Sequence, residues 1–293
     1  MPDGYGLQVV GTAPAPRLTQ AESDEHLIDL WLHGKGPQSQ RAYAGDIAAF
    51  RAFVGKPLRA MTLGDVQAFQ DSLKGLAPAS QARRISAVKS LLSFAHTLGY
   101  LAFNIGAPVK PPAVKNKLAE RVLDERAVSE MVYGEPNARN RALLRLLYFG
   151  GLRISEVCGL RVRDLQPRDD AGQVTVFGKG GQTRIVLLKA TAWRDLEPLR
   201  VADPDAPVFR SREGGRPLDP SMVHRIVKAA AVRAGLSPAV SAHWLRHAHV
   251  SHALDNGAPV HLVQATVGHA SLGTTSRYAH ARPGDSSSRY LRG

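Results

Sequence analysis

Side chains that could bind a phosphate or transfer a proton gather in the second half of the sequence. Arg153 follows a glycine pair and precedes a short predicted helix, so its guanidinium and that helix's N–H groups could bind one phosphate together. Lys179 lies in a glycine-rich turn, where an ammonium group could protonate a leaving oxygen. Arg246 follows His243 by three residues, which puts an anion-binding group and a proton carrier on one helix face.

A tyrosine, Tyr278, follows His269 by nine residues. A phenol with a pKa near 10 holds little phenolate at neutral pH, so a nucleophilic tyrosine needs a neighbouring base or positive charge. Taken one at a time, all of these residues are explained as well by packing or solvent exposure. Their joint order along the chain is what indicates a site.

Metal and nucleotide sites are two alternative interpretations of the same segments. His243 and His247 are four residues apart, as zinc ligands on a helix can be, but Arg246 between them would repel a cation and no glutamate follows the first histidine. The turn at Lys179 resembles a nucleotide-binding loop only superficially, because its glycine spacing is one residue too long and glycine follows the lysine. We therefore expect no metal, no ATP and no other cofactor.

The composition points to a basic globular protein. The 293 residues include 38 Lys and Arg against 25 Asp and Glu, a net charge of +13, and 44% are hydrophobic. Such a chain can bury a core and has the length of two domains. Its excess of positive charge indicates a polyanionic partner, with nucleic acid as the first candidate and a basic surface without a partner as the alternative. The single cysteine, Cys158, fits a reducing cytoplasm. No signal peptide is expected, because Met1 to Pro16 lacks a basic region followed by an apolar stretch. No membrane span is expected, since the most apolar segment, Ala142 to Gly151, is short and contains Arg145.

Apolar periodicity predicts a mainly α fold with one small antiparallel sheet. The predicted strands, 173–177 and 183–188, are joined as a hairpin by a glycine-rich turn. The predicted helices are 18–32, 39–54, 62–73, 78–97, 124–133, 138–149, 156–160, 190–200, 220–234, 243–255, 259–267 and 274–280.

A basic, proline-rich stretch from residue 104 separates the helical first part from the rest and reads as an extended linker. The predicted divisions are a tail (1–17), a helical domain (18–103), the linker (104–122) and a second domain with a C-terminal tail (123–293). In the helical domain, Arg83, Arg84 and Lys89 lie on one helix and are candidates for DNA phosphate contacts, with a solvated charged face as the alternative.

Read in order, Gly-Leu-Arg153-Ile-Ser-Glu, Lys179 in a hairpin, His243-Trp-Leu-Arg246, Gly-His269 and Tyr278 resemble the active-site set of the tyrosine recombinases, or phage-type integrases. The resemblance runs from about Leu18 to Tyr278. It is strongest from His243 to Tyr278, where the residues and their spacing are similar to those of the Xer-type members. Two places depart from the family pattern: Thr266 stands where leucine is usual, and the end of the chain from Arg282 has no close match.

The resemblance implies a two-domain fold, a helical core-binding domain that clamps DNA and an α/β catalytic domain, and a role for each matched residue. Tyr278 would attack the phosphodiester and form a 3′-phosphotyrosyl link. Arg153 and Arg246 would bind the non-bridging oxygens. The remaining implied roles are leaving-group protonation by Lys179, proton exchange with the tyrosine by His243, a hydrogen bond to phosphate from His269 and support of Arg153 by Glu156.

The family also implies double-stranded DNA as partner, strand exchange through a Holliday junction, and four protomers on two DNA sites or pairing with a second related recombinase. DNA integration or excision and chromosome dimer resolution are both compatible with these residues, and the target sequence is not specified by them. A type IB topoisomerase-like DNA relaxing activity and a DNA-binding module that does not cut are the competing functions.

Overall fold

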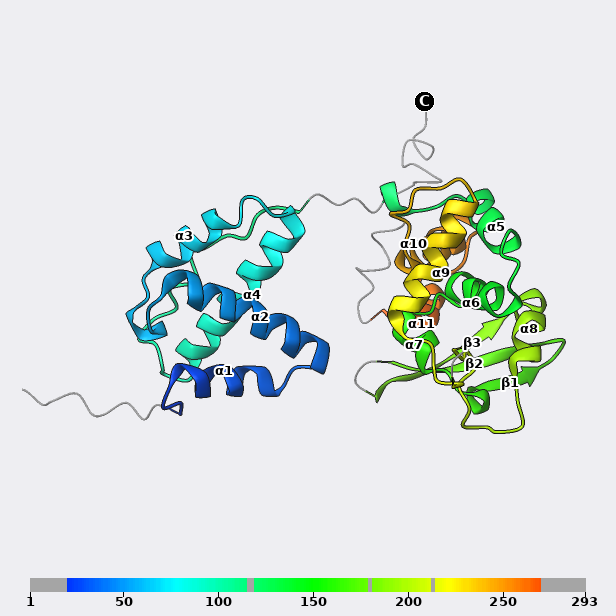
Figure 1. Cartoon of the computed structure of the whole chain (residues 1–293), viewed down its shortest axis with the longest axis horizontal. Coiled ribbons are helices and arrows are strands. Elements are labelled where there is room, and N and C mark those ends of the chain that lie inside the picture. The colour runs from blue at the N-terminus through cyan, green and yellow to red at the C-terminus, as the bar shows by residue number, and fades with distance from the viewer. Residues whose placement is uncertain (1–19, 115–118, 179–180, 212–213, 270–293) are drawn as a thin grey trace, which may run out of the picture. The chain divides into compact units, whose positions relative to one another are not determined.

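The computed structural model describes residues 20–114, 119–178, 181–211 and 214–269 (Figure 1). The chain divides into two compact units between Lys115 and Asn116. The described elements are helices plus one three-stranded antiparallel sheet, which confirms the predicted mainly α fold class. Over these described ranges, no helix is both long enough and apolar enough to span a lipid bilayer.

Unit 1 is helical throughout its described part. Its α-helices are α1 (Asp24–His33), α2 (Pro37–Val54), α3 (Leu63–Ser72) and α4 (Pro78–Thr97), with a 3₁₀ turn at Leu58–Ala60. α2 and α4 pack against each other and α1 packs against both. The inner faces meet in one apolar core, in which Phe50, Ile85 and Leu91 are fully buried.

Two N-terminal caps fix where helices of unit 1 begin. Ser23 is extended and its hydroxyl accepts a hydrogen bond from the His26 N–H at 3.1 Å, so α1 begins at Asp24 and not at Leu18 as predicted. Thr62 and Asp65 form a reciprocal capping box at α3. Such a cap satisfies N–H groups that the helix itself leaves unpaired.

The first part of the predicted linker packs against unit 1. Ile105 and Val109 are 6% and 4% exposed and belong to the apolar core of that unit. The Lys89 ammonium donates hydrogen bonds to the carbonyls of Ala107, at 3.1 Å, and Val109. Unit 1 therefore holds its own C-terminal extension as part of its fold.

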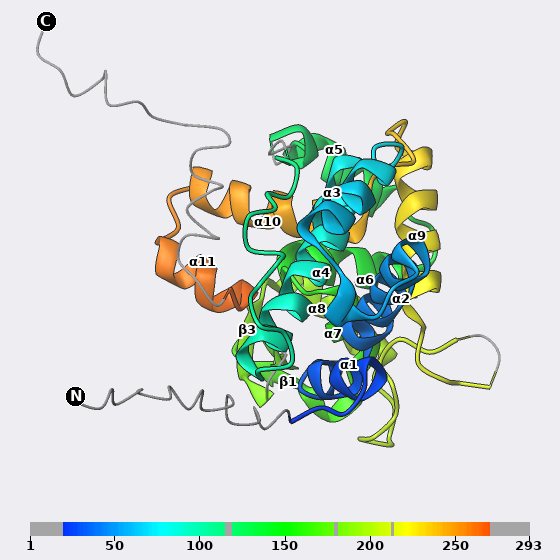
Figure 2. The same cartoon turned by 90° about the vertical axis from the view of Figure 1, so that its left-hand side faces the viewer.

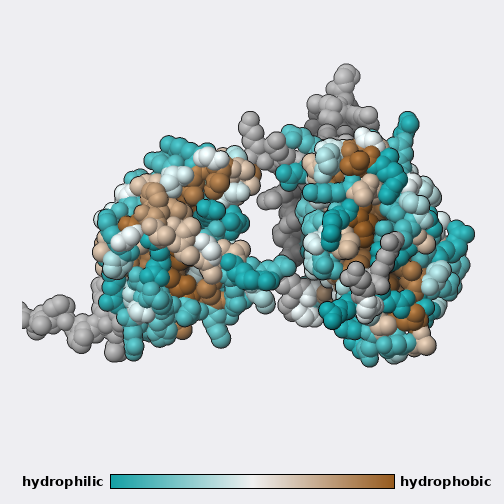
Figure 3. Space-filling view, in the orientation of Figure 1, coloured by the Kyte–Doolittle hydropathy of each residue, from teal (hydrophilic) through white to brown (hydrophobic). Residues whose placement is uncertain are grey.

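Unit 2 consists of helices around a small sheet. Its helices are α5 (Glu125–Tyr133), α6 (Ala138–Phe149), α7 (Ile154–Gly159), α8 (Ala190–Leu196), α9 (Pro220–Arg233), α10 (Ala242–Asp255) and α11 (Val260–Val267), with 3₁₀ turns at Ala119–Arg121, Val162–Asp164 and Glu197–Leu199. α6 lies at the centre, and its residues from Ala142 to Leu147 are all buried. Even Arg145 in this stretch is only 9% exposed, and it pairs with Asp195 at 3.1 Å. Figure 3 shows that hydrophilic residues cover much of the visible face of each unit, with apolar residues between them.

The sheet has the order β1 (Leu165–Arg168), β2 (Ala171–Phe177), β3 (Thr183–Leu188), with both pairs antiparallel. β2 and β3 confirm the predicted hairpin strands, whereas the prediction missed β1. Only one residue of β1 is buried. The strand contains Pro167, which is tolerated because β1 is an edge strand. Such a strand has neither an alternating pattern nor a β-rich composition to reveal it.

Helix α8 packs against the inner face of the sheet. Trp193, 5% exposed, lies directly over Gly172 of β2, so close that a Cβ atom there would be 2.1 Å from the indole ring. Glycine at this position lets the ring contact the backbone of the central strand.

We expect Gly172→Ala to destabilise unit 2 by about 1–3 kcal/mol, because Trp193 would have to leave its place in the core. Gly159→Ala is the matched control, since no atom lies within 4 Å of a Cβ there and alanine favours its helix. Calorimetry of the full chain would measure both. Equal unfolding temperatures for the two variants would contradict this account of the packing.

Candidate active site

A tight turn brings Arg153 to the start of α7. Gly151 adopts a positive φ of 58°, and a Cβ there would be 2.9 Å from both the His249 ring and the Val267 side chain. The turn therefore packs against α10 and α11 without a side chain of its own. Arg153 follows it as the extended residue that precedes Ile154, and its N–H donates to Glu156 at 2.7 Å.

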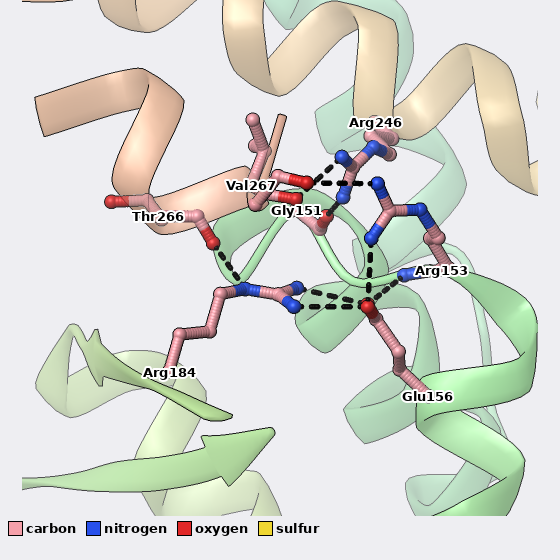
Figure 4. A network of polar contacts seen from close by, with 8 residues as sticks. Gly151, Arg153, Glu156, Arg184, Arg246, Thr266 and Val267 are labelled. Carbon is pink, nitrogen blue, oxygen red and sulfur yellow. Dashed lines mark hydrogen bonds and ion pairs between the residues drawn. The ribbon is translucent and has the colours of Figure 1, made fainter. Parts of the chain in front are cut away.

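Glu156 is a buried carboxylate held between two arginines. Its side chain is 4% exposed. Arg153 Nη1 donates to Oε1 at 2.9 Å, and Arg184 of β3 donates to both oxygens, each at 2.9 Å (Figure 4). Burial alone would raise the pKa of Glu156, but the hydrogen bonds from Arg184 and from Arg153 outweigh burial and lower this pKa below its ordinary value. The carboxylate is therefore ionised at neutral pH.

Arg246 is the most deeply buried of the arginines in the site, at 1% exposure. Its guanidinium donates to the carbonyl of Gly151 and, at 2.6 Å, to the carbonyl of Val267. Arg153 Nη2 donates to the next carbonyl of the same chain end, that of Gly268, at 3.1 Å. The C-terminal carbonyls of α11 thus orient two guanidinium groups from different helices, and they carry the partial negative charge that suits this contact (Figure 4).

His269 is placed by the end of α11. Gly268 has a left-handed backbone, with φ 64° and ψ 51°, and ends the helix. The Gln264 side chain donates to the His269 carbonyl at 3.0 Å, and the His269 N–H donates to the Gln264 carbonyl at 3.2 Å. α11 packs beside α10, as Figures 1 and 2 also show, so the turn delivers His269 to the region of Arg246.

The histidines of the site are neutral at physiological pH. Desolvation and the charges of Arg246 and Arg153 lower the pKa of His269 to about 4 and also lower the pKa of His243. His243 lies in the first turn of α10 with an exposed side chain, and its ring is 4.1 Å from that of His247. Desolvation lowers the pKa of His247 to about 3. A neutral imidazole can accept a proton as well as donate a hydrogen bond.

The structure brings together Arg153, Glu156, His243, Arg246 and His269 of the predicted set. The two remaining residues, Lys179 and Tyr278, lie outside the described residues. Gly178 and Gln182, which flank the turn of Lys179, are joined by a backbone hydrogen bond of 2.7 Å, so the chain enters and leaves this turn as a hairpin.

The three candidate DNA contacts of unit 1 have protein partners in this structure. Arg83 binds both oxygens of the buried Asp46, one of them at 2.9 Å, and Arg84 lies 3.7 Å from the same carboxylate. Lys89 is bound to the carbonyls of Ala107 and Val109. These contacts join α4 to α2 and to the end of unit 1, and the DNA-binding role of the three residues stays a prediction.

The sequence analysis missed Arg184. The signal was present: Arg184 alternates in phase with Val186 and Leu188, which face the core at 1% and 6% exposure. A charged residue on the inner face of a strand requires a buried partner, here Glu156. Among the described residues, no three His, Cys, Asp or Glu side chains cluster in a way that could hold a metal ion.

The arrangement is suited to binding a phosphate. Two guanidinium groups bind one carboxylate, and the third, that of Arg246, binds the carbonyl next to the one that Arg153 binds. This leaves an excess of positive charge beside two neutral imidazoles. These groups are positioned by helix ends and a buried ion pair before any ligand arrives, as electrostatic stabilisation of a transition state requires.

Comparison with known proteins identifies related chains. A model of the phage integrase family matches residues 121–284, and a model of the phage integrase N-terminal SAM-like domain matches residues 24–98. The chain is 35% identical over 260 residues to the tyrosine recombinase XerC of Xylella fastidiosa (strain M23), which covers 84% of this chain and 87% of the relative.

Two solved structures share the fold. One is the XerH site-specific recombinase bound to difH substrate in a pre-cleavage complex, with a TM-score of 0.68, 22% identity and coverage of 88% of this chain and 81% of that chain. The other is a lambda integrase tetramer bound to a Holliday junction, with a TM-score of 0.69, 18% identity and coverage of 88% and 78%.

We expect the stability of unit 2 to fall in acid, partly through His249, which packs beneath Gly151. Desolvation lowers the pKa of His249 from 6.5 to about 4, so folding favours its neutral form. Its contribution is complete above pH 6.5 and is lost as the pH falls toward 4, because the unfolded chain then binds the extra proton.

The variant His249→Gln, which replaces this imidazole with an amide, should lose about 2 kcal/mol less stability between pH 7 and pH 5 than the wild type. Calorimetry at the two pH values measures the effect, with His224→Gln, at an exposed position of α9, as the control. An unchanged pH dependence in His249→Gln would refute the assignment.

Proposed function

Because the chain belongs to the phage integrase family and is a tyrosine site-specific recombinase, we propose that it cuts and rejoins double-stranded DNA through Tyr278. The Tyr278 oxygen attacks the scissile phosphorus, and the bond from phosphorus to the 5′-oxygen breaks. The products are a 3′-phosphotyrosyl link and a free 5′-hydroxyl. The new link retains the energy of the phosphodiester, so rejoining needs no ATP. In this proposal the arginines supply the positive charge at the phosphate, so the reaction needs no metal ion.

Each proton in this step has a carrier. His243, neutral at physiological pH, accepts the phenolic proton of the attacking tyrosine. Lys179 gives a proton to the departing 5′-oxygen. Both transfers reverse when a 5′-hydroxyl attacks the phosphotyrosyl bond and restores the tyrosine.

The charge that builds up on the non-bridging oxygens is matched by Arg153 and Arg246. Both guanidinium groups are tied to carbonyls at the end of α11, so they are oriented before the phosphate binds. His269 is neutral because its pKa is lowered, and it adds a hydrogen bond to the same phosphate. The observation that carries the proposal is this convergence of both arginines, Glu156 and both histidines from α7, α10 and the end of α11.

The remaining parts of the proposal concern assembly. The helical domain clamps the DNA, with Arg83, Arg84 and Lys89 as candidate phosphate contacts. Four protomers, identical or paired with a second related recombinase, assemble on two DNA sites and exchange strands through a Holliday junction. The related lambda integrase tetramer bound to a Holliday junction supports this arrangement. The enzyme acts on DNA in the cytoplasm.

The nucleophile is tested with a nicked suicide substrate whose site has been selected from a random-sequence duplex pool by retention on the protein. We expect the wild type to form a covalent protein–DNA complex in EDTA without ATP, and Tyr278→Phe to bind the DNA but form none, because the attacking oxygen is gone. A denaturing gel detects the complex.

Tyr133→Phe is the matched control for that experiment, since Tyr133 lies in the same unit with 68% exposure. A covalent complex with Tyr278→Phe would refute the assigned nucleophile. Products of relaxation without strand exchange would instead support the topoisomerase-like activity.

The leaving-group acid is tested with a substrate in which sulfur replaces the 5′-bridging oxygen. We expect Lys179→Ala to slow cleavage of the ordinary substrate by about 100-fold or more, and to cleave the sulfur substrate nearly as fast as wild type, because a thiolate leaves without a proton. Single-turnover kinetics measure both rates. Lys228→Ala, at an exposed position of α9, is the control, and an equal defect on both substrates would overturn the role.

A further inference from the structure

Arg184 makes an unusually complete set of contacts for a residue on a small sheet. Its side chain is 13% exposed. Nη1 and Nη2 donate to the two oxygens of Glu156, each at 2.9 Å, and Nε donates to the carbonyl of Thr266 in α11 at 2.7 Å. A Cβ at Gly268 would be 3.2 Å from Nη1, so the guanidinium also packs against the turn that ends α11.

Arg153 makes a different kind of contact with the same carboxylate. Of its guanidinium only Nη1 binds Glu156, at 2.9 Å, beside the backbone N–H at 2.7 Å, while Nη2 donates to the Gly268 carbonyl at 3.1 Å. Its side chain is 42% exposed. Arg153 is thus held by one edge and keeps an accessible part of its guanidinium, whereas Arg184 is buried against the carboxylate and Figure 4 shows it on the opposite side of Glu156 from Arg153.

This division of contacts matters because Glu156 is 4% exposed and ionised. A buried carboxylate needs a counter-ion at close range, and the strongest one is an arginine that binds both oxygens. If Arg184 were absent, Arg153 would be the nearest cation to fill that role. Its guanidinium would then turn fully toward Glu156 and away from the position that a DNA phosphate would occupy.

We infer that Arg184 is a positioning residue of the cleavage reaction. By neutralising Glu156 from the side of the sheet, it leaves the charge of Arg153 available to the scissile phosphate. This inference rests on the proposed function. It assigns to β3 a part in the chemistry that is separate from the support of the Lys179 hairpin.

The test uses Arg184→Met, Glu156→Gln and the double variant on the suicide substrate described above. Arg184→Met should lower the single-turnover cleavage rate by about 10- to 100-fold, as expected for a displaced catalytic group, with unchanged DNA affinity. Removal of the carboxylate charge should then suppress this defect. The double variant should cleave faster than Arg184→Met and within about threefold of Glu156→Gln.

Suppression separates positioning from a merely structural role, because the double variant has lost more native contacts than either single variant. Arg168→Met is the matched control, since Arg168 lies on β1 of the same sheet with its side chain 53% exposed, and it should cleave like the wild type. A double variant slower than Arg184→Met, or Arg184→Met with a wild-type rate, would overturn the inference.

A crystal structure of Arg184→Met supplies a readout that does not depend on activity. Arg153 should bind both oxygens of Glu156 and leave the Gly268 carbonyl. If Arg153 keeps its contact with Gly268, the inference is wrong. If wild-type protein bound to its DNA site forms no covalent complex, the proposed function fails. The position of Arg153 in the crystal structure of Arg184→Met still decides whether Arg184 positions Arg153.

Discussion

The ionised carboxylate of Glu156, buried at 4% exposure, is the interaction on which the site depends. An isolated charge there would be strongly destabilising, so the fold must bring cations to it. It does so from two directions: from Arg153, the residue that precedes the same helix, and from Arg184 of β3, which follows Glu156 by 28 residues. The ion pair therefore fixes the sheet against α7, and the position of Arg153 follows from the balance between the two arginines.

The second constraint is the C-terminus of α11. A helix end exposes carbonyls that have no partner within the helix, and those of Thr266, Val267 and Gly268 each accept from a different arginine: Arg184, Arg246 and Arg153 respectively. The arginines thus satisfy the carbonyls of the helix end, and this one helix sets the spacing of the three positive charges. Because the same turn continues into His269, a shift of α11 would move the arginines and the histidine together.

Local signals in the sequence predicted most elements, because capping residues and apolar periodicity act over a few residues. Arg153 and Arg246 were singled out by the joint order of short motifs along the chain and by their resemblance to the family pattern, not by any one local signal. The local signals missed β1, which has one buried residue, and Arg184, whose partner is distant in sequence. The linker was predicted too long for the same reason: Ile105 and Val109 look like part of a proline-rich spacer until tertiary packing buries them in unit 1.

The pKa values of the histidines are lowered first by desolvation and then by the arginine charges that are proposed to bind the phosphate. Desolvation, together with the positive charges of Arg246 and Arg153, keeps His269 and His243 neutral. A bound phosphate brings negative charge into that field, which favours the protonated imidazoles. In the proposed reaction, proton uptake by His243 is therefore easiest when the scissile phosphate is in place and the tyrosine must lose its proton. If the site acts as proposed, the arginines that bind the phosphate also make the protonation of the general base depend on the bound substrate.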